Sequence, residues 1–120
     1  MATRTYRAHH YYADVTARKL RPFANLIRGK YADEALESLK YLPNRGARLM
    51  EAVLKSALGN AEFQDERNMD GLIVSEARVD GGPMFKRIHT RARGMAYRIF
   101  KRLAHIHVSI EAPEEQGVRK

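Results

Sequence analysis

The sequence predicts an α+β fold, in which a small globular domain of three helices packs on an antiparallel sheet and a long basic β-hairpin protrudes from it. Three observations in the 120 residues support this prediction. Apolar residues in the first half recur at the spacing of amphipathic helices. Apolar and polar residues alternate near the C-terminal end, as in a strand with one buried face. Between the last two predicted strands lies a segment that is rich in Lys and Arg and has too few apolar residues to form a core.

The first predicted elements are a short strand and a helix. Residues 3–7 combine β-branched and aromatic side chains, which favours a strand. Asp14 or Thr16 then caps a helix that ends at Gly29, a residue typical of the position after a helix. Pro22 has to lie in the first turn of this helix or kink it, because proline has no backbone N–H to donate. The apolar stripe of the helix consists of Leu20, Phe23, Ala24 and Ile27.

Two further helices follow. Helical spacing predicts one from Ala32 to Tyr41, and Pro43 stops it. Asn44 is a favourable N-cap for the longest helix, which spans about residues 45–63. The predicted core stripe of the longest helix is Met50, Val53, Leu54, Ala57, Leu58 and Ala61. The small residues that let another element approach this helix closely are Ser56, Ala57, Gly59 and Asn60.

Two strands are predicted in the second half of the chain. One runs from Leu72 to about Asp80, with Ile73, Ala77 and Val79 on one face. The other shows strict alternation, which indicates a half-buried strand that can pair antiparallel with the first. Its alternating residues are His105, Ile106, His107, Val108, Ser109 and Ile110.

The segment between these strands, residues 81–103, predicts a hairpin. If both halves continue as strands, about twelve residues at roughly 3.3 Å each give an arm on the order of 40 Å long. A two-stranded ribbon of that length is marginally stable in water unless something binds it. We therefore predict one domain over residues 1–112, with a globular part at about 1–80 and 104–112. The hairpin occupies about 81–103, and a polar tail follows at 113–120.

The charge distribution indicates a polyanionic partner. The chain has a formal net charge of +8 and an isoelectric point near 10.0. Residues 81–110 contain seven Lys or Arg and no Asp or Glu, and residues 1–30 contain seven Lys or Arg and one acid. An ordinary solvated surface mixes both signs, so a stretch without acids points to counter-charges on a partner, nucleic acid before an anionic membrane.

Composition also excludes several classes of protein. The chain has no Cys, which rules out disulfide scaffolds, thiolate metal sites and cysteine nucleophiles. No apolar run approaches the roughly 18 residues of a spanning helix, and the start lacks the apolar core of a signal peptide. We expect a cytoplasmic protein with no membrane partner.

The candidate nucleic-acid contacts form two basic sets, because Lys and Arg neutralise phosphates. The hairpin set is Lys86, Arg87, Arg91, Arg93, Arg98, Lys101 and Arg102. The second set, on and just after the first helix, is Arg18, Lys19, Arg21, Arg28 and Lys30. Phe85, Tyr97 and Phe100 lie among the hairpin cations and either stack on unpaired bases or pack across the strands. The glycines expected to supply turns and close backbone approach are Gly81, Gly82 and Gly94.

The residues give little support to catalysis. His9-His10 and His105-x-His107 have no nearby Cys or paired carboxylate, so they are interpreted as surface or RNA-facing side chains and no metal site is predicted. We find no nucleophile motif and no glycine-rich phosphate loop, so we expect neither an enzyme nor a cofactor. The alternative binding function is an architectural DNA-binding protein that inserts basic β-arms into the minor groove, with Ile88 or Phe85 as an apolar wedge.

The ordered set of short motifs resembles the universal family of large-ribosomal-subunit protein twenty-two, in its bacterial form. The resemblance covers roughly residues 5–110. In the body, the matching stretches are Leu26-Ile27-Arg28-Gly29-Lys30, Glu34-Ala35-Leu36 with Leu39, and Ser56-Ala57 followed by Asn60-Ala61-Glu62. In the hairpin, they are Val79-Asp80 with Gly82-Pro83, Lys86-Arg87-Ile88, Arg91-Ala92-x-Gly94, Arg98-Ile99, Lys101-Arg102 and His105-Ile106-x-Val108. Met95 stands where the family usually has a basic residue, and Thr90 where proline is common.

The resemblance implies a structural, non-catalytic protein of the large ribosomal subunit that binds ribosomal RNA. It implies that the hairpin contacts several domains of this RNA, that the protein aids early subunit assembly, and that the hairpin lines the nascent-peptide exit tunnel. The implied partners are large-subunit ribosomal RNA, neighbouring large-subunit proteins that include the other tunnel-lining protein, and the passing nascent peptide, with no stable homo-oligomer. Carried onto this chain, the RNA contacts are Arg28, Lys30 and the hairpin cations. The tunnel-facing tip is Lys86, Arg87, Ile88, His89, Thr90, Arg91, Ala92 and Arg93.

Overall fold

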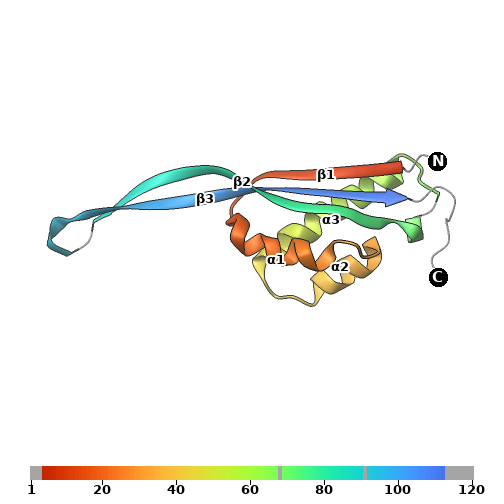
Figure 1. The fold of residues 1–120 in the computed structure, drawn as a ribbon, viewed down its shortest axis with the longest axis horizontal. Helices are drawn as coiled ribbons and strands as arrows, with labels where there is room; N and C mark the ends of the chain where they lie inside the picture. Colours follow the sequence, from red (N-terminus) through yellow and green to blue (C-terminus); the bar gives the residue numbers. More distant parts are fainter. Residues whose placement is uncertain (1–3, 68, 91, 113–120) are drawn as a thin grey trace.

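The computed structural model describes residues 4–67, 69–90 and 92–112. A strand, β1 (Arg4–Ala13), precedes three helices, α1 (Ala17–Ile27), α2 (Ala32–Lys40) and α3 (Arg45–Phe63). Two long strands follow, β2 (Ile73–Thr90) and β3 (Ala96–Ala112), with single 3₁₀ turns at Met69–Gly71 and Ala92–Gly94. The strands form one antiparallel sheet in the order β1-β3-β2, and the helices cover one face of it (Figure 1). The predicted α+β class, with three helices on an antiparallel sheet, is confirmed.

The helices form where the apolar stripes predict them. In α1, Leu20, Ala24 and Ile27 are buried, and Gly29 follows with a φ of +86°. This left-handed conformation suits glycine, and it lets the Gly29 N–H donate to the Val74 carbonyl at 2.8 Å. Pro22 lies inside α1, in its second turn rather than its first, where an exposed ring replaces a backbone donor.

The longest helix, α3, has the predicted bounds and buries most of the predicted stripe. Met50 and Leu54 are fully buried, and Leu58 is partly buried against the core. Asn44 occupies the N-cap position, although its side chain makes no capping hydrogen bond. Gly59 is exposed, and a Cβ built there would meet nothing within 4 Å, so the expected close approach at this glycine is wrong. The close approach is at Gly46 instead, where a Cβ would lie 2.8 Å from the Phe23 ring.

The N-terminal strand is longer than predicted. It extends to Ala13 because Tyr6, Ala8 and Ala13 turn towards the helices and are buried while β1 pairs with β3. The pairing is regular from Arg4↔Ala112 to His10↔Ile106 and shifts before Ala13.

The buried face of β2 differs from the prediction. The pairing with β3 shifts between Val74 and Glu76, so one extra residue is inserted at this point. A bulge of this kind reverses the alternation of side chains on the strand. As a result Val74 is fully buried and Ile73 only half-buried, while Ala77 and Val79 face the core as expected.

The hairpin gives the molecule an elongated shape. The principal extents of the molecule are 67 × 26 × 20 Å. Its radius of gyration is 17.9 Å, whereas about 14 Å is expected for a compact domain of this length. Beyond the body, β2 and β3 pair from Met84↔Arg102 to Thr90↔Ala96. Figure 1 shows that this part of the hairpin extends past the helices, which cover only the body. We refer to the paired residues 84–90 and 96–102, with the turn between them, as the arm.

Candidate nucleic-acid interface

The arm presents cations and apolar side chains together. Lys86, Arg93, Lys101 and Arg102 are exposed on it. Large apolar side chains of the arm are also exposed, among them Ile88 at 77%. An extended surface that mixes exposed cations with exposed apolar groups is suited to single-stranded or irregular nucleic acid, which offers both phosphates and base faces.

Strand register pairs arm cations with aromatic or apolar neighbours. Lys86 lies opposite Phe100, and the Arg102 guanidinium lies 6.0 Å from the centre of the Phe100 ring. Phe85 lies opposite Lys101. Each phenylalanine keeps more than two-fifths of its surface exposed. Both rings are therefore accessible for stacking on a partner.

Several predicted arm residues are placed only by their backbone. Arg87 pairs with Ile99, Arg98 with Ile88, and His89 with Tyr97. Thr90 pairs with Ala96, and Ala92 begins the turn. Arg91 lies outside the described residues.

The chain reverses at Gly94 and not at the other two predicted turn glycines. Arg93 and Gly94 both adopt left-handed conformations, with φ of +62° and +72°. Gly81 and Gly82 lie within β2, next to a shift in its pairing with β3, so they do not make a turn. Gly82 does provide close approach, because a Cβ there would lie 3.2 Å from the Leu103 backbone.

The second predicted basic set divides into two groups. Arg18 and Lys19 are exposed on α1. Arg21 donates to the Val79 carbonyl at 3.4 Å, and Arg28 donates to the Ala77 carbonyl.

Arg21 and Arg28 thus donate hydrogen bonds to carbonyl groups along the outer edge of β2. Without such donors, an unpaired strand edge is open to pairing with other chains. Lys30 is half-buried and donates to the Ser38 hydroxyl at 3.4 Å. Arg21, Arg28 and Lys30 therefore each have an intramolecular role beside any contact with a partner.

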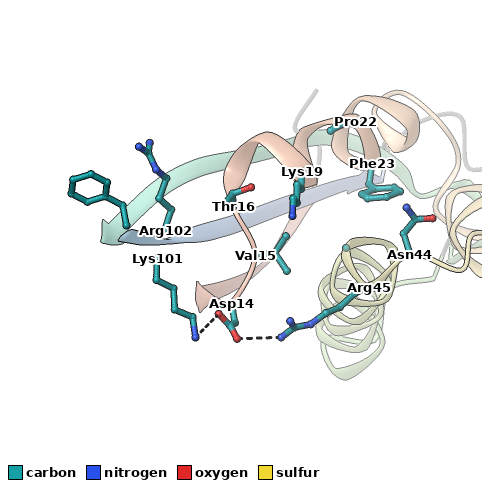
Figure 2. Close-up of a pocket in the computed structure, with 12 residues that line it drawn as sticks. Asp14, Val15, Thr16, Lys19, Pro22, Phe23, Asn44, Arg45, Lys101 and Arg102 are labelled. Carbon is teal, nitrogen blue, oxygen red and sulfur yellow. Dashed lines mark ion pairs between the residues drawn. The ribbon is translucent and has the colours of Figure 1, made fainter. Parts of the chain in front are cut away.

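The tertiary structure brings Lys19, Lys101 and Arg102 together at the foot of the arm, with two residues that the sequence did not suggest (Figure 2). Asp14 forms one ion pair with Arg45 at 3.5 Å and another with Lys101 at 3.4 Å. The sequence marked Asp14 only as a candidate helix cap and as the one acid before residue 31, and the cap position is occupied by Thr16 instead. Arg45 follows a helix cap and carried no such signal.

Histidine and tyrosine side chains gather on the sheet face opposite the helices. The His9 and His107 Nδ1 atoms are 2.6 Å apart, so one ring donates and the other accepts. Tyr11 packs against both of these rings and against His105. The expectation that His107 is a surface residue is wrong: it is only 8% exposed, because β3 is the central strand.

Burial lowers the pKa of His107. The positive charge of Arg78 and the neighbouring His9 also lower this pKa, while Asp80, 3.3 Å from the His107 Nε2, opposes them. Within the described ranges, no three His, Cys, Asp or Glu side chains are grouped so that they would hold a metal ion. In the same ranges no helix is long and apolar enough to cross a membrane.

The amino-acid sequence is similar to known proteins over most of its length. The family model for ribosomal protein L22p/L17e matches residues 8–111. The large ribosomal subunit protein uL22 of Rhodopirellula baltica is 51% identical over 110 residues, which cover 88% of this chain and 92% of that protein. The protein of the same name from Caldicellulosiruptor saccharolyticus is 48% identical over 103 residues, covering 86% of this chain and 84% of that protein.

Proposed function

The chain belongs to the ribosomal protein L22p/L17e family, and from this premise we propose that its arm binds large-subunit ribosomal RNA and lines the nascent-peptide exit tunnel. Membership makes the chain a bacterial-type structural protein of the large ribosomal subunit rather than an enzyme. Its place is accordingly in the ribosome, in the cytoplasm. The proposal concerns the finer functions: which surface binds RNA, what it assembles with, and where the tip lies.

One observation carries the proposal: the arm extends past the helices, and its described cations and large apolar side chains are exposed. A two-stranded ribbon gains little stability from its own contacts, so exposed apolar groups such as Ile88 are best explained by a partner that covers them. Because residues 81–110 contain seven Lys or Arg and no Asp or Glu, we infer that this partner is a polyanion.

We assign the body a positioning role and the arm a binding role. The helices and the covered half of the sheet form a rigid base, while the arm enters RNA and replaces counterions with Lys and Arg. A single arm that contacts several RNA domains would bring them together early in subunit assembly. The tip predicted from the family, residues 86–93, includes the start of the turn at Ala92–Gly94 that ends the arm. It would reach the tunnel wall, beside the other tunnel-lining protein and the passing nascent peptide.

The full set of proposed RNA contacts combines the two basic sets, with phosphates as their targets. These residues are Arg18, Lys19, Arg21, Arg28, Lys30, Lys86, Arg87, Arg91, Arg93, Arg98, Lys101 and Arg102. Exposure favours Arg18, Lys19 and Lys86 over the half-buried Lys30.

A matched pair of triple variants tests this division of roles. The arm variant carries Lys86→Gln, Arg93→Gln and Arg102→Gln, and all three parent side chains are exposed. The control removes the same charge from exposed residues of the body, with Lys40→Gln, Lys55→Gln and Arg67→Gln. Each phosphate contact contributes about 0.7–0.9 to the slope of log affinity against log salt concentration. For binding to purified large-subunit RNA, the slope of log affinity against log salt concentration should therefore become less steep by about 2–3 in the arm variant. The slope should change little in the control.

The same variants can be followed in cells. Tagged wild-type protein should sediment with the large subunit in a sucrose gradient at high salt, and so should the control. The arm variant should shift towards free protein or towards incomplete particles. Equal losses in both variants would contradict the assignment of RNA binding to the arm. Recovery of the wild type on chromosomal DNA would favour the architectural DNA-binding alternative.

A further inference from the structure

The two faces of the arm carry different sets of side chains. Successive residues of a strand point to opposite faces, and residues that are directly paired across two strands share a face. Phe85 and Lys101 are paired with each other and therefore lie on one face. The register places five other side chains together on the opposite face, which we call the Phe100 face: Met84, Lys86, Ile88, Phe100 and Arg102.

Contacts at the foot of the arm agree with this division. A groove lies where the arm joins the body, and its lining includes Asp14, Arg45 and Lys101. Lys101 turns towards Asp14 and forms an ion pair with it at 3.4 Å, whereas Arg102 points the other way from β3 (Figure 2). The Arg102 guanidinium lies 6.0 Å from the centre of the Phe100 ring. Lys101 is thus engaged by its own body, while Arg102 lies beside the aromatic ring of the Phe100 face.

The Phe100 face carries positive charge and no acid. Residues 81–110 contain no Asp or Glu, so the arm itself has no carboxylate to place beside Lys86 and Arg102. Lys86 lies directly opposite Phe100. Arg102 follows Phe100 by two residues, which is about 7 Å along a strand. The ring therefore has one cation across the strands and another along its own strand.

The remaining side chains of this face are apolar and exposed. The exposed fraction is 42% for Phe100, 46% for Met84 and 77% for Ile88. Cations beside an exposed aromatic ring match the two parts of a nucleotide, because phosphates need charge and a base needs a flat apolar surface. Bases in a double helix are stacked on one another, so an exposed ring favours an unpaired nucleotide.

We propose that the Phe100 face binds an unpaired nucleotide of large-subunit ribosomal RNA, with its base stacked on Phe100 and its two adjacent phosphates on Lys86 and Arg102. The proposal rests on the RNA-binding function proposed above, and it assigns one face of the arm and one state of the RNA. Because these side chains share a face, a single strand of RNA contacts them together. Met84 and Ile88, on either side of Lys86 along β2, then contact the neighbouring nucleotides.

The first test measures the contribution of the base and uses the full chain with purified large-subunit RNA as the probe. Phe100→Leu keeps an apolar side chain but removes the ring, so it should weaken binding by about 5- to 150-fold, equivalent to about 1–3 kcal/mol for one stacked base. Phe100→Tyr keeps the ring and should retain most of the affinity. Phe63→Leu makes the same exchange at an exposed ring of the body and should leave the affinity unchanged.

Phe85→Leu compares the two faces of the arm directly. Phe85 is about as exposed as Phe100, at 47%, but it lies on the opposite face with Lys101. Phe85→Leu should therefore cause a smaller loss of affinity than Phe100→Leu. An equal or larger loss for Phe85→Leu would overturn the assignment of the base to the Phe100 face, and so would equal affinities for the Leu and Tyr variants of Phe100.

The second test measures the phosphates through the salt dependence of binding. Lys86→Gln and Arg102→Gln should each make the slope of log affinity against log salt concentration less steep by about 0.7–0.9, the value of one phosphate contact. Arg67→Gln, at an exposed cation of the body, should leave the slope unchanged. An unchanged slope for Lys86→Gln or Arg102→Gln would overturn the assignment of a phosphate to that cation. If the wild type itself shows no salt-dependent binding, the proposed function fails as well, so the two failures are distinguishable.

The third test identifies the occupant in the assembled subunit. A photo-crosslinking residue placed at Met84 should form an adduct with ribosomal RNA, and the crosslinked nucleotide should be unpaired. The same probe at Phe63, which is 87% exposed on the body, serves as the control position. An adduct at Met84 with a ribosomal protein or with a base-paired nucleotide would overturn the proposal, and so would an RNA signal no higher than the Phe63 background.

Discussion

The same two strands have different surroundings in the two halves of the molecule. In the body, β3 is the central strand beneath the helices, and Ile106, Val108 and Ile110 are fully buried. In the arm, β2 and β3 continue with the same antiparallel pairing, yet Ile88 and Phe100 are exposed. Backbone pairing is thus shared by both halves, whereas the apolar side chains named here are buried in the body and exposed in the arm.

This contrast separates folding from binding. Burial of apolar surface contributes roughly 25 cal/mol per Å², so the body supplies most of the stability of the free chain. The arm has pairing without burial, which is typical of an element that is completed by a partner. Changes in the body should therefore affect unfolding, and changes in the arm should affect assembly.

The largest expected effect is on the core of the body. Leu54→Ala removes a fully buried side chain of α3 and should lower the free energy of unfolding by about 2–5 kcal/mol. Ile88→Ala truncates a side chain of the arm that is 77% exposed, so it should change the free energy of unfolding by less than about 0.5 kcal/mol. Urea denaturation followed by circular dichroism measures both. A comparable loss for Ile88→Ala would mean that the arm packs on a surface of its own chain.

The next effect concerns the tip. Gly94→Val places a β-branched residue at a φ of +72°, which costs roughly 1–2 kcal/mol in the local conformation. Because the tip makes few contacts with the body, we expect the strain to distort the arm and reduce incorporation into large subunits, with the thermal unfolding of the body nearly unchanged. Sedimentation and thermal melts of the same variant test this separation. A large fall in the melting temperature would contradict it.

A smaller and opposite effect is expected at a glycine of the body. Gly59 lies within α3, and a Cβ there would meet nothing within 4 Å. Gly59→Ala should therefore raise the free energy of unfolding by about 0.5–1 kcal/mol, because alanine loses less backbone entropy in a helix. Gly94→Ala adds the same atom, also in open space, but at a positive φ, so it should not stabilise the chain. Urea denaturation of both variants compares them directly.

The smallest effect is a pH dependence within the body. Burial lowers the pKa of His107 from the ordinary value of 6.5, so folding favours its neutral form. The stability linked to this group is complete above about pH 6.5 and is lost as pH falls towards and through the lowered pKa. His107→Gln should lose less stability than the wild type between pH 7 and pH 5, measured by denaturation at each pH. A His107 pKa above 6.5 in an NMR titration would contradict the assigned sign.

Much of this protein follows from the sequence. The bounds of α3, the order of helices and strands, and the basic hairpin could be predicted because they depend on local periodicity, charge and turn residues. The family could be recognised because its motifs stand in order along the chain. Gly94 was predicted to be a turn residue for a local reason as well, since a left-handed conformation favours glycine at the position itself.

Other features were decided by the tertiary structure, because they depend on residues that are far apart in the sequence. No local pattern indicates that β3 is the central strand, and so His107 was expected at the surface although it is buried. The bulge that turns Val74 inward depends on the pairing of β2 with β3. The groove at the foot of the arm exists only because folding brings Asp14, Arg45 and Lys101 together from three separate segments. Sequence periodicity specifies which face of each element is apolar, but only packing specifies which elements meet.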